Sequence, residues 1–166
     1  MEKITRDFSG STSVALSSDG SDLAVGAPYN DDENGLEDSG HVCVYGNENG
    51  SWKQIGDDMY GENENDHSDS SVALSSDGSV LAVAAYRNDR RSGLEDSGHV
   101  RVYRNENGSW KQEIGDDVYG ENEFDYSGNN TGSAGRSVAL SDDGSVLAVG
   151  AVFNDENGSD SGHVRV

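Results

Sequence analysis

Apolar side chains along this chain alternate with polar or small ones, which is the spacing of β-strands. The run Ser13-Val14-Ala15-Leu16 shows this pattern, and it returns at residues 71–74 and 137–140. A second run, Leu23-Ala24-Val25-Gly26-Ala27, places larger side chains on one face and Ala or Gly on the other, so that the small face can pack closely on a neighbouring sheet. No segment carries an extended apolar pattern of helical period, and the sequence therefore predicts an all-β fold.

The recurrence of the first run divides the chain into repeats. We place them at residues 13–70, 71–136 and 137–166, the last about half as long as the others, with residues 1–12 as the remnant of a loop between repeats. Repeats of this size are typical of stacked units, each of which buries its apolar face against a neighbour.

Each complete repeat is expected to form four short antiparallel strands. Asp19-Gly20 and Asn49-Gly50 are expected to form the tight turns of hairpins, because these residue types tolerate a positive φ. The fourth strand begins at Trp52 in the first repeat and at Trp110 in the second. Glu113, an extra residue in the second repeat, is expected to form a β-bulge.

The order Ser-Val-Ala-Leu-x-x-Asp-Gly-Ser-x-Leu-Ala-Val-Gly-Ala, then Asn-Asp, then Ser-Gly-His-Val-x-Val-Tyr resembles the FG-GAP repeat of integrin-α-type β-propellers, from Ser13 to Val166. The resemblance implies four-stranded blades, about two and a half of them in this chain. It also implies a non-catalytic module for extracellular or cell-surface binding and adhesion, often with calcium in blade loops. The usual calcium loop of the family has Ala and Ser here, for example Ala15 and Ser17, so that particular site is not expected.

A propeller typically closes with four to eight blades. The chain is therefore expected to need further blades, or another copy of itself, for closure. Of these two arrangements we favour a fragment of a longer propeller.

The charge of the chain excludes several classes of partner. It has 32 Asp and Glu against 11 Lys and Arg, a formal net charge of -21. Such a surface repels nucleic acids and anionic membranes, and no apolar run approaches the roughly 20 residues that span a bilayer. We expect neither nucleic-acid binding nor membrane insertion, and the sequence leaves open whether the ligand is a protein or a glycan.

The acidic loop between the second and third strands is the best candidate for a metal site. Its oxygen-bearing side chains are Asp31, Asp32, Asn34 and Asp38 in the first repeat, and Asp155, Asn157 and Asp160 in the third. Calcium prefers such oxygen ligands, so we predict weak calcium binding at these two loops. The same residue types also form Asx turns without an ion, and this alternative stays open.

Other chemistry-bearing residues give weaker signals. The histidines at equivalent strand starts are expected to be structural, and Cys43 is expected to be an incidental substitution because Arg101 and Arg165 hold its place in the other repeats. Adjacent acids such as Asp57-Asp58 arise by chance in so acidic a chain, although glycosidases use paired carboxylates. We therefore predict a protein that is not an enzyme, with a carbohydrate-active enzyme fragment and a non-functional repeat remnant as the alternatives.

Overall fold

The computed structural model describes residues 13–88, 94–112, 117–122, 137–159 and 161–166. These residues form thirteen β-strands and no helix, so the predicted all-β class is confirmed. Within the same residues, no helix has the length and apolar character needed to cross a membrane.

The strands form three antiparallel sheets, in which most strands pair with the next strand along the chain. Sheet 1 contains β1 (Val14–Leu16), β2 (Asp22–Ala27), β3 (His41–Glu48), β4 (Ser51–Gln54) and β5 (Met59–Tyr60). Sheet 2 contains β6 (Ser68–Leu74), β7 (Val80–Ala85), β8 (His99–Glu106), β9 (Ser109–Gln112) and β10 (Val118–Tyr119). Sheet 3 contains β11 (Val138–Leu140), β12 (Leu147–Ala151) and β13 (His163–Arg165), and none of the three sheets closes on itself in the described chain.

The fourth strand of sheets 1 and 2 is interrupted. β4 and β5 both pair with β3, where Tyr45 lies opposite Gln54 and Val42 lies opposite Met59. β9 and β10 pair with β8 in the same way, but the interruption there contains one residue more. Glu113, the predicted bulge residue, lies outside the described residues.

The glycines of the Asp-Gly turns have the positive φ that these residue types tolerate, whereas the aspartates do not. Gly20, Gly78 and Gly144 all have a positive φ, between 69° and 72°. In the second turn Asp77 accepts hydrogen bonds from the backbone N–H of Ser79 and from the hydroxyls of Ser75 and Ser79. These bonds, above all that of the Ser79 N–H, favour the ionised carboxylate and lower the pKa of Asp77 to about 2.

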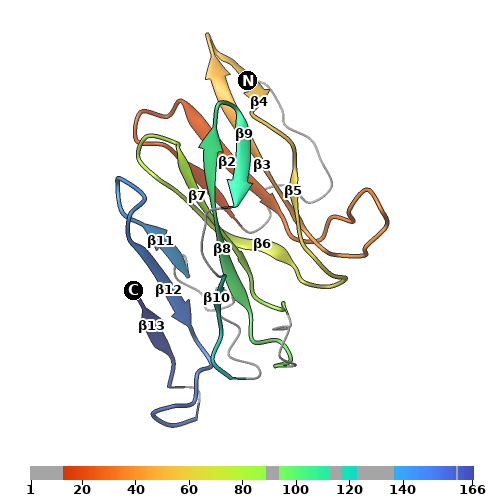
Figure 1. Ribbon diagram of the computed structural model, residues 1–166, viewed down its shortest axis with the longest axis vertical. Helices are drawn as coiled ribbons and strands as arrows, with labels where there is room; N and C mark the ends of the chain where they lie inside the picture. The colour runs from red at the N-terminus through yellow and green to blue at the C-terminus, as the bar shows by residue number, and fades with distance from the viewer. Residues whose placement is uncertain (1–12, 89–93, 113–116, 123–136, 160) are drawn as a thin grey trace.

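The three sheets pack face to face in the order of the chain (Figure 1). In its first two strands, each sheet has one face lined by alanines, which we call the alanine face, and an opposite face lined by Val and Leu, the valine–leucine face. The alanine faces carry Ala15 and Ala24 in sheet 1, Ala73 and Ala82 in sheet 2, and Ala139 and Ala148 in sheet 3. The valine–leucine faces carry Val14, Leu16, Leu23 and Val25 in sheet 1, Val72, Leu74, Leu81 and Val83 in sheet 2, and Val138, Leu140, Leu147 and Val149 in sheet 3.

Both junctions between sheets join an alanine face to a valine–leucine face. At the first junction Ala15 and Ala24 of sheet 1 share a hydrophobic cluster with Leu81 of sheet 2. At the second, Ala82 of sheet 2 shares a cluster with Val138 of sheet 3. Small side chains let the backbones approach, and the larger side chains of the next sheet fill the space between them.

Part of one face at each end of the stack is exposed in the described residues. Val14, Val72 and Val138 hold the same position in the three repeats, yet Val14 is 49% exposed while Val72 and Val138 are each 1% exposed. At the other end, Ala139 is exposed whereas its counterpart Ala15 is buried. Sheet 1 thus presents a valine–leucine face at one end of the stack, and sheet 3 presents an alanine face at the other. These are the two kinds of face that meet at the internal junctions.

Candidate functional site

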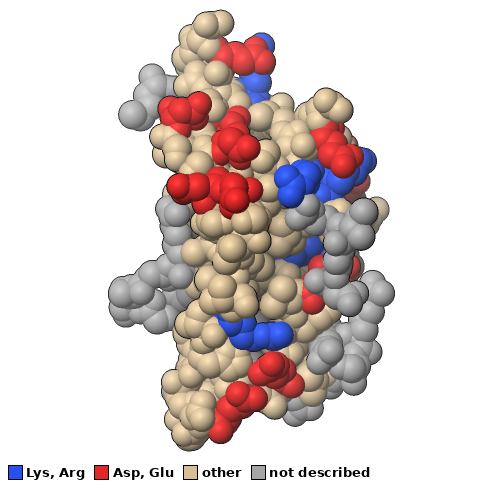
Figure 2. All heavy atoms as spheres, turned by 60° about the vertical axis from the view of Figure 1, so that its left-hand side comes forward, with Lys and Arg blue, Asp and Glu red and all other residues tan. Residues whose placement is uncertain are grey.

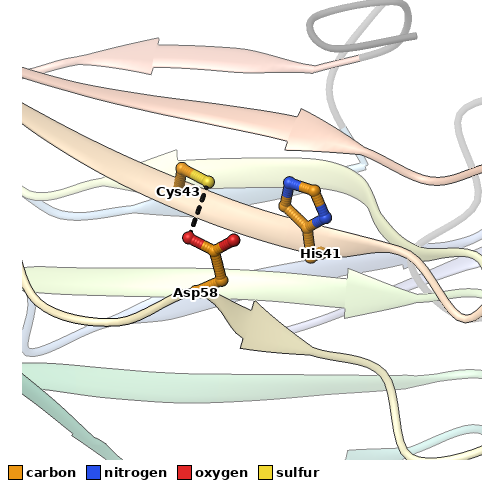
Figure 3. A group of neighbouring side chains, drawn as sticks. All are labelled: His41, Cys43 and Asp58. Atoms are coloured by element: carbon orange, nitrogen blue, oxygen red, sulfur yellow. Dashed lines mark hydrogen bonds between the residues drawn. The ribbon is translucent and has the colours of Figure 1, made fainter. Parts of the chain in front are cut away.

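His41, Cys43 and Asp58 form a compact cluster of potential metal ligands in sheet 1 (Figure 3). His41 and Cys43 are alternate residues of β3 and therefore project from the same face of the strand. Asp58 comes from the interruption just before β5, on the strand edge that pairs with β3. The potential ligand atoms of the three side chains all lie within 4.8 Å of one another, and the Cys43 thiol donates a hydrogen bond to Asp58 Oδ1 at 3.1 Å.

Neighbouring polar groups hold these three side chains in place. The amide nitrogen of Asn30 lies 2.9 Å from Nδ1 of His41. Gln54 donates to Asp58 Oδ1 at 2.5 Å, and the Tyr60 hydroxyl donates to Asp58 Oδ2 at 3.2 Å. His41 and Cys43 are buried and Asp58 is half-buried, so the cluster is largely shielded from solvent.

Repeat two has the same arrangement with one difference. His99, Gln112, Asp117 and Tyr119 correspond to His41, Gln54, Asp58 and Tyr60, but Arg101 stands at the position of Cys43. Gln112 and the Tyr119 hydroxyl donate to Asp117, as their counterparts donate to Asp58. The two sites therefore differ in whether a guanidinium or a thiol faces the carboxylate.

The guanidinium changes the electrostatics of the repeat-two site. Burial alone would raise the pKa of Asp117, but the hydrogen bonds and the charge of Arg101 outweigh it and hold that pKa below its usual value. The same hydrogen bond raises the pKa of Arg101. Arg101 also donates to Glu62 of the preceding repeat at 2.8 Å, so it links sheet 2 to the segment that follows sheet 1.

The predicted calcium loop of repeat one is organised by its own hydrogen bonds. Asp32 Oδ1 accepts from the backbone N–H of Leu36 at 2.7 Å and of Asn34 at 2.9 Å, and Asp32 Oδ2 accepts from the Asn34 amide. Asp31 Oδ1 accepts from the backbone N–H of Asp38 at 3.0 Å. The bonds that Asp32 accepts, led by that of the Leu36 N–H, lower the pKa of Asp32. The bond from the Asn34 N–H, two residues after Asp32, is that of an Asx turn, which forms without an ion.

The corresponding loop of repeat three is described only in part. Asp155 and Asn157 are exposed, and Asp160 lies outside the described residues.

The carboxylate oxygens of the repeat-one loop already accept hydrogen bonds from backbone N–H groups. A calcium ion there would have to displace these bonds to collect its six to eight oxygen ligands. Calcium at the two loops stays a prediction.

An aromatic group spans repeats one and two at the end of the sheets where the acidic loops lie. The His67 ring packs edge-on against Tyr29, with centroids 5.0 Å apart, and against Tyr86, with centroids 5.6 Å apart. Nδ1 of His67 also lies 3.1 Å from the Tyr86 hydroxyl, and Arg87 stacks over the Tyr86 ring. We call Tyr29, His67, Tyr86 and Arg87 the loop-end cluster. Tyr29 is 44% exposed, so the cluster presents an aromatic surface to solvent.

The acidity of the chain is visible on its surface. Figure 2 shows Asp and Glu side chains in several separate groups on one side of the molecule, with Lys and Arg beside some of them. On this side, the acidic groups do not merge into a single patch.

No protein-family model matches this chain, and no curated protein matches it either.

Proposed function

We propose that this chain is a stack of β-propeller blades of FG-GAP type that serves as a non-catalytic binding or adhesion module. The observation that carries this proposal is the same pairing of faces at both junctions, alanine face against valine–leucine face. Repetition of one junction with the same residues in the same register is typical of modular repeats. The motif order that repeats within the chain and resembles FG-GAP repeats supports the assignment of blades.

The end faces of the stack support closure by further blades. The exposed face of sheet 1, with Val14 and Leu16, is of the kind that sheet 2 buries at the first junction. The exposed face of sheet 3, with Ala139, is of the kind that sheet 1 buries there. We propose that blades with the same pair of faces cover them, from a longer polypeptide or from another copy of the chain.

The loop-end cluster is the best candidate for the binding surface of this module. Loops on a rigid sheet scaffold are common sites of recognition, and Tyr and Arg contribute strongly to binding energy. Buried Asp66 supports the cluster, because it accepts a hydrogen bond from Asn88 at 2.8 Å and so ties the segment of His67 to the second repeat. A protein or a glycan fits this surface, and the family resemblance suggests an extracellular or cell-surface location with calcium assisting.

A binding screen tests this function. The chain would be probed with a glycan array and a displayed peptide library, and the selected ligands would then be measured against two variants. Tyr29→Ala removes the exposed ring of the loop-end cluster and should weaken binding at least tenfold. Lys53→Ala changes an exposed residue of β4, near the opposite end of β3, and should leave binding unchanged. Absence of any ligand, equal effects of the two variants, or turnover of a bound glycan would contradict the proposal.

A further inference from the structure

We propose that His41, Cys43 and Asp58 form a binding site for a zinc ion. The four-coordinate zinc sites of proteins use Cys, His and Asp ligands with bonds of roughly 2.0–2.3 Å, which places ligand atoms about 3.5 Å from one another. The ligand atoms of this cluster lie within 4.8 Å of one another, and Cys43 Sγ and Asp58 Oδ1 are already 3.1 Å apart. Small side-chain rotations bring the three atoms around one ion.

The ligand types select the metal. A thiolate and an imidazole are soft or borderline donors, which favour zinc and other late transition metals over calcium or magnesium. Calcium takes six to eight oxygen ligands, and this cluster offers one carboxylate. The site is thus chemically different from the acidic loops for which the sequence predicts calcium.

Comparison with repeat two supports a cation at this place. There Arg101 directs its guanidinium at Asp117, and His99 and Tyr119 complete the surroundings. Repeat one keeps the corresponding His, Asp, Gln and Tyr and replaces the arginine by Cys43. A zinc ion bound by the Cys43 thiolate would bring positive charge to Asp58, as the guanidinium brings it to Asp117.

The groups around the cluster suit the ligand roles of its members. Figure 3 shows one ring nitrogen of His41 on the side of Cys43 and the other turned away from it. Asn30 contacts Nδ1, so Nε2 is the nitrogen that binds the ion. For Nε2 to bind the ion, Nδ1 must carry the ring proton, and the Asn30 side-chain amide, whose nitrogen faces Nδ1 here, must turn so that its oxygen accepts the hydrogen bond. Outer contacts of this kind orient metal-binding histidines. Gln54 and Tyr60 hold the Asp58 carboxylate in the same manner.

Binding exchanges a proton for the ion. The Cys43 thiol loses its proton to solvent as the sulfur–zinc bond forms, and the hydrogen bond from Sγ to Asp58 gives way to coordination of both groups by zinc. Three protein ligands leave the fourth tetrahedral position for a water molecule or for a donor from a bound partner.

Cobalt serves as the spectroscopic probe for this site. Titration of the metal-free chain with Co²⁺ should give thiolate-to-cobalt charge-transfer absorption that saturates at one equivalent, and Zn²⁺ should abolish it. Bound Zn²⁺ should also raise the melting temperature. A chain without this absorption, or one that saturates only with a large excess of metal, overturns the proposal.

Three variants locate the site. Cys43→Arg reproduces the residue of repeat two, so it should stay folded, show no charge-transfer absorption and keep its melting temperature when Zn²⁺ is added. Asp58→Asn should weaken zinc binding at least tenfold. Asp57→Asn removes a neighbouring exposed acid and should bind like the parent chain. Retained binding in a folded Cys43→Arg variant, or equal losses in Asp57→Asn and Asp58→Asn, contradicts the assignment.

Discussion

Arg101 and Asp117 form a two-point ion pair, in which Nε donates to Oδ1 at 2.9 Å and Nη2 donates to Oδ2 at 2.6 Å. The side chains are 12% and 6% exposed, so the pair is largely withdrawn from solvent. Asp117 directly precedes β10, and Arg101 lies in β8. The pair therefore fixes the interrupted edge strand of sheet 2 to its neighbour.

Loss of this ion pair should destabilise the fold. Arg101→Ala leaves the buried Asp117 carboxylate without the guanidinium, and removal of one partner from a buried pair costs about 3 kcal/mol. Urea denaturation would measure the change in the free energy of unfolding. The exposed pair Lys53–Glu48 provides the control, because Lys53→Ala should cost no more than about 0.5 kcal/mol. Similar losses in the two variants would mean that burial does not strengthen the pair at Arg101.

Three valines at one repeat position test the stacking of the sheets. Val72 and Val138 are buried at the two junctions, so replacing either with Ala removes two buried methyl groups and should cost about 2 kcal/mol. Val14→Ala, at the exposed end face, should change the free energy of unfolding by less than about 0.5 kcal/mol. Thermal and urea unfolding measure all three variants. Equal losses at all three positions would show that the face of sheet 1 is covered in solution.

His99 should make the stability depend on pH. Burial, together with the charge of Arg101, lowers the pKa of His99 to about 4, while the unfolded chain has the ordinary value near 6.5. Above pH 6.5 the His99 side chain is neutral in the folded and in the unfolded chain, so its full contribution to the free energy of unfolding is present at neutral pH. As the pH falls from 6.5 towards 4, only the unfolded state gains a proton, and stability is lost. Between pH 7 and pH 5 the loss should be about 2 kcal/mol.

Two variants isolate this effect from the titration of the many acids. His99→Gln should remove about 2 kcal/mol from the difference in unfolding free energy between pH 7 and pH 5. His163→Gln, at the equivalent and more exposed position of sheet 3, is the matched control variant. A His99→Gln variant with the parent's pH dependence would contradict the role of His99.

The Asp-Gly turns allow a paired test of close packing. Gly20 and Gly144 have nearly the same φ, 72° and 69°, but an added Cβ would meet nothing within 4 Å at Gly20 and would lie 2.7 Å from Val80 at Gly144. Gly20→Ala should cost about 1 kcal/mol for its left-handed backbone alone. Gly144→Ala should cost roughly 2 kcal/mol more, because the methyl group is forced into sheet 2. Equal shifts in melting temperature would show that the third turn does not pack on Val80.

Calcium at the acidic loops remains open to a direct test. A small rise in melting temperature is expected in millimolar calcium, and it should be reduced in Asp32→Asn. The effect should be weak because calcium must compete with the backbone N–H groups that Asp32 already accepts. Asp57→Asn, which changes an exposed acid outside the loop, is the control. An unchanged melting temperature together with an empty calorimetric titration would remove this prediction.

Local features of the fold could be predicted from the sequence. The alternation of apolar and small side chains predicts strands such as β2 and β7, and the Asp-Gly pairs predict the turns that precede these strands. Both signals lie within a few residues of the chain. The interruption between β4 and β5 was not expected in the first repeat. Its cause is a change of pairing register along β3, which no short stretch of sequence encodes.

The His41–Cys43–Asp58 cluster was missed for a related reason. The spacing of His41 and Cys43 places them on one side of a strand, and this signal was available in the sequence. Asp58 joins them only because β5 returns alongside β3. The alignment of repeats correctly matched Cys43 with Arg101, but it carried no information about the carboxylate that each of them faces.

The repeated pairing of an alanine face with a valine–leucine face gives the stack a direction. Any unit can follow any other, because every unit offers the same two contacts in the same order. Unequal recombination within such a gene would therefore lengthen or shorten the array while each surviving contact kept its partner residues. The number of repeats can therefore change during evolution while the contacts between neighbouring sheets stay the same.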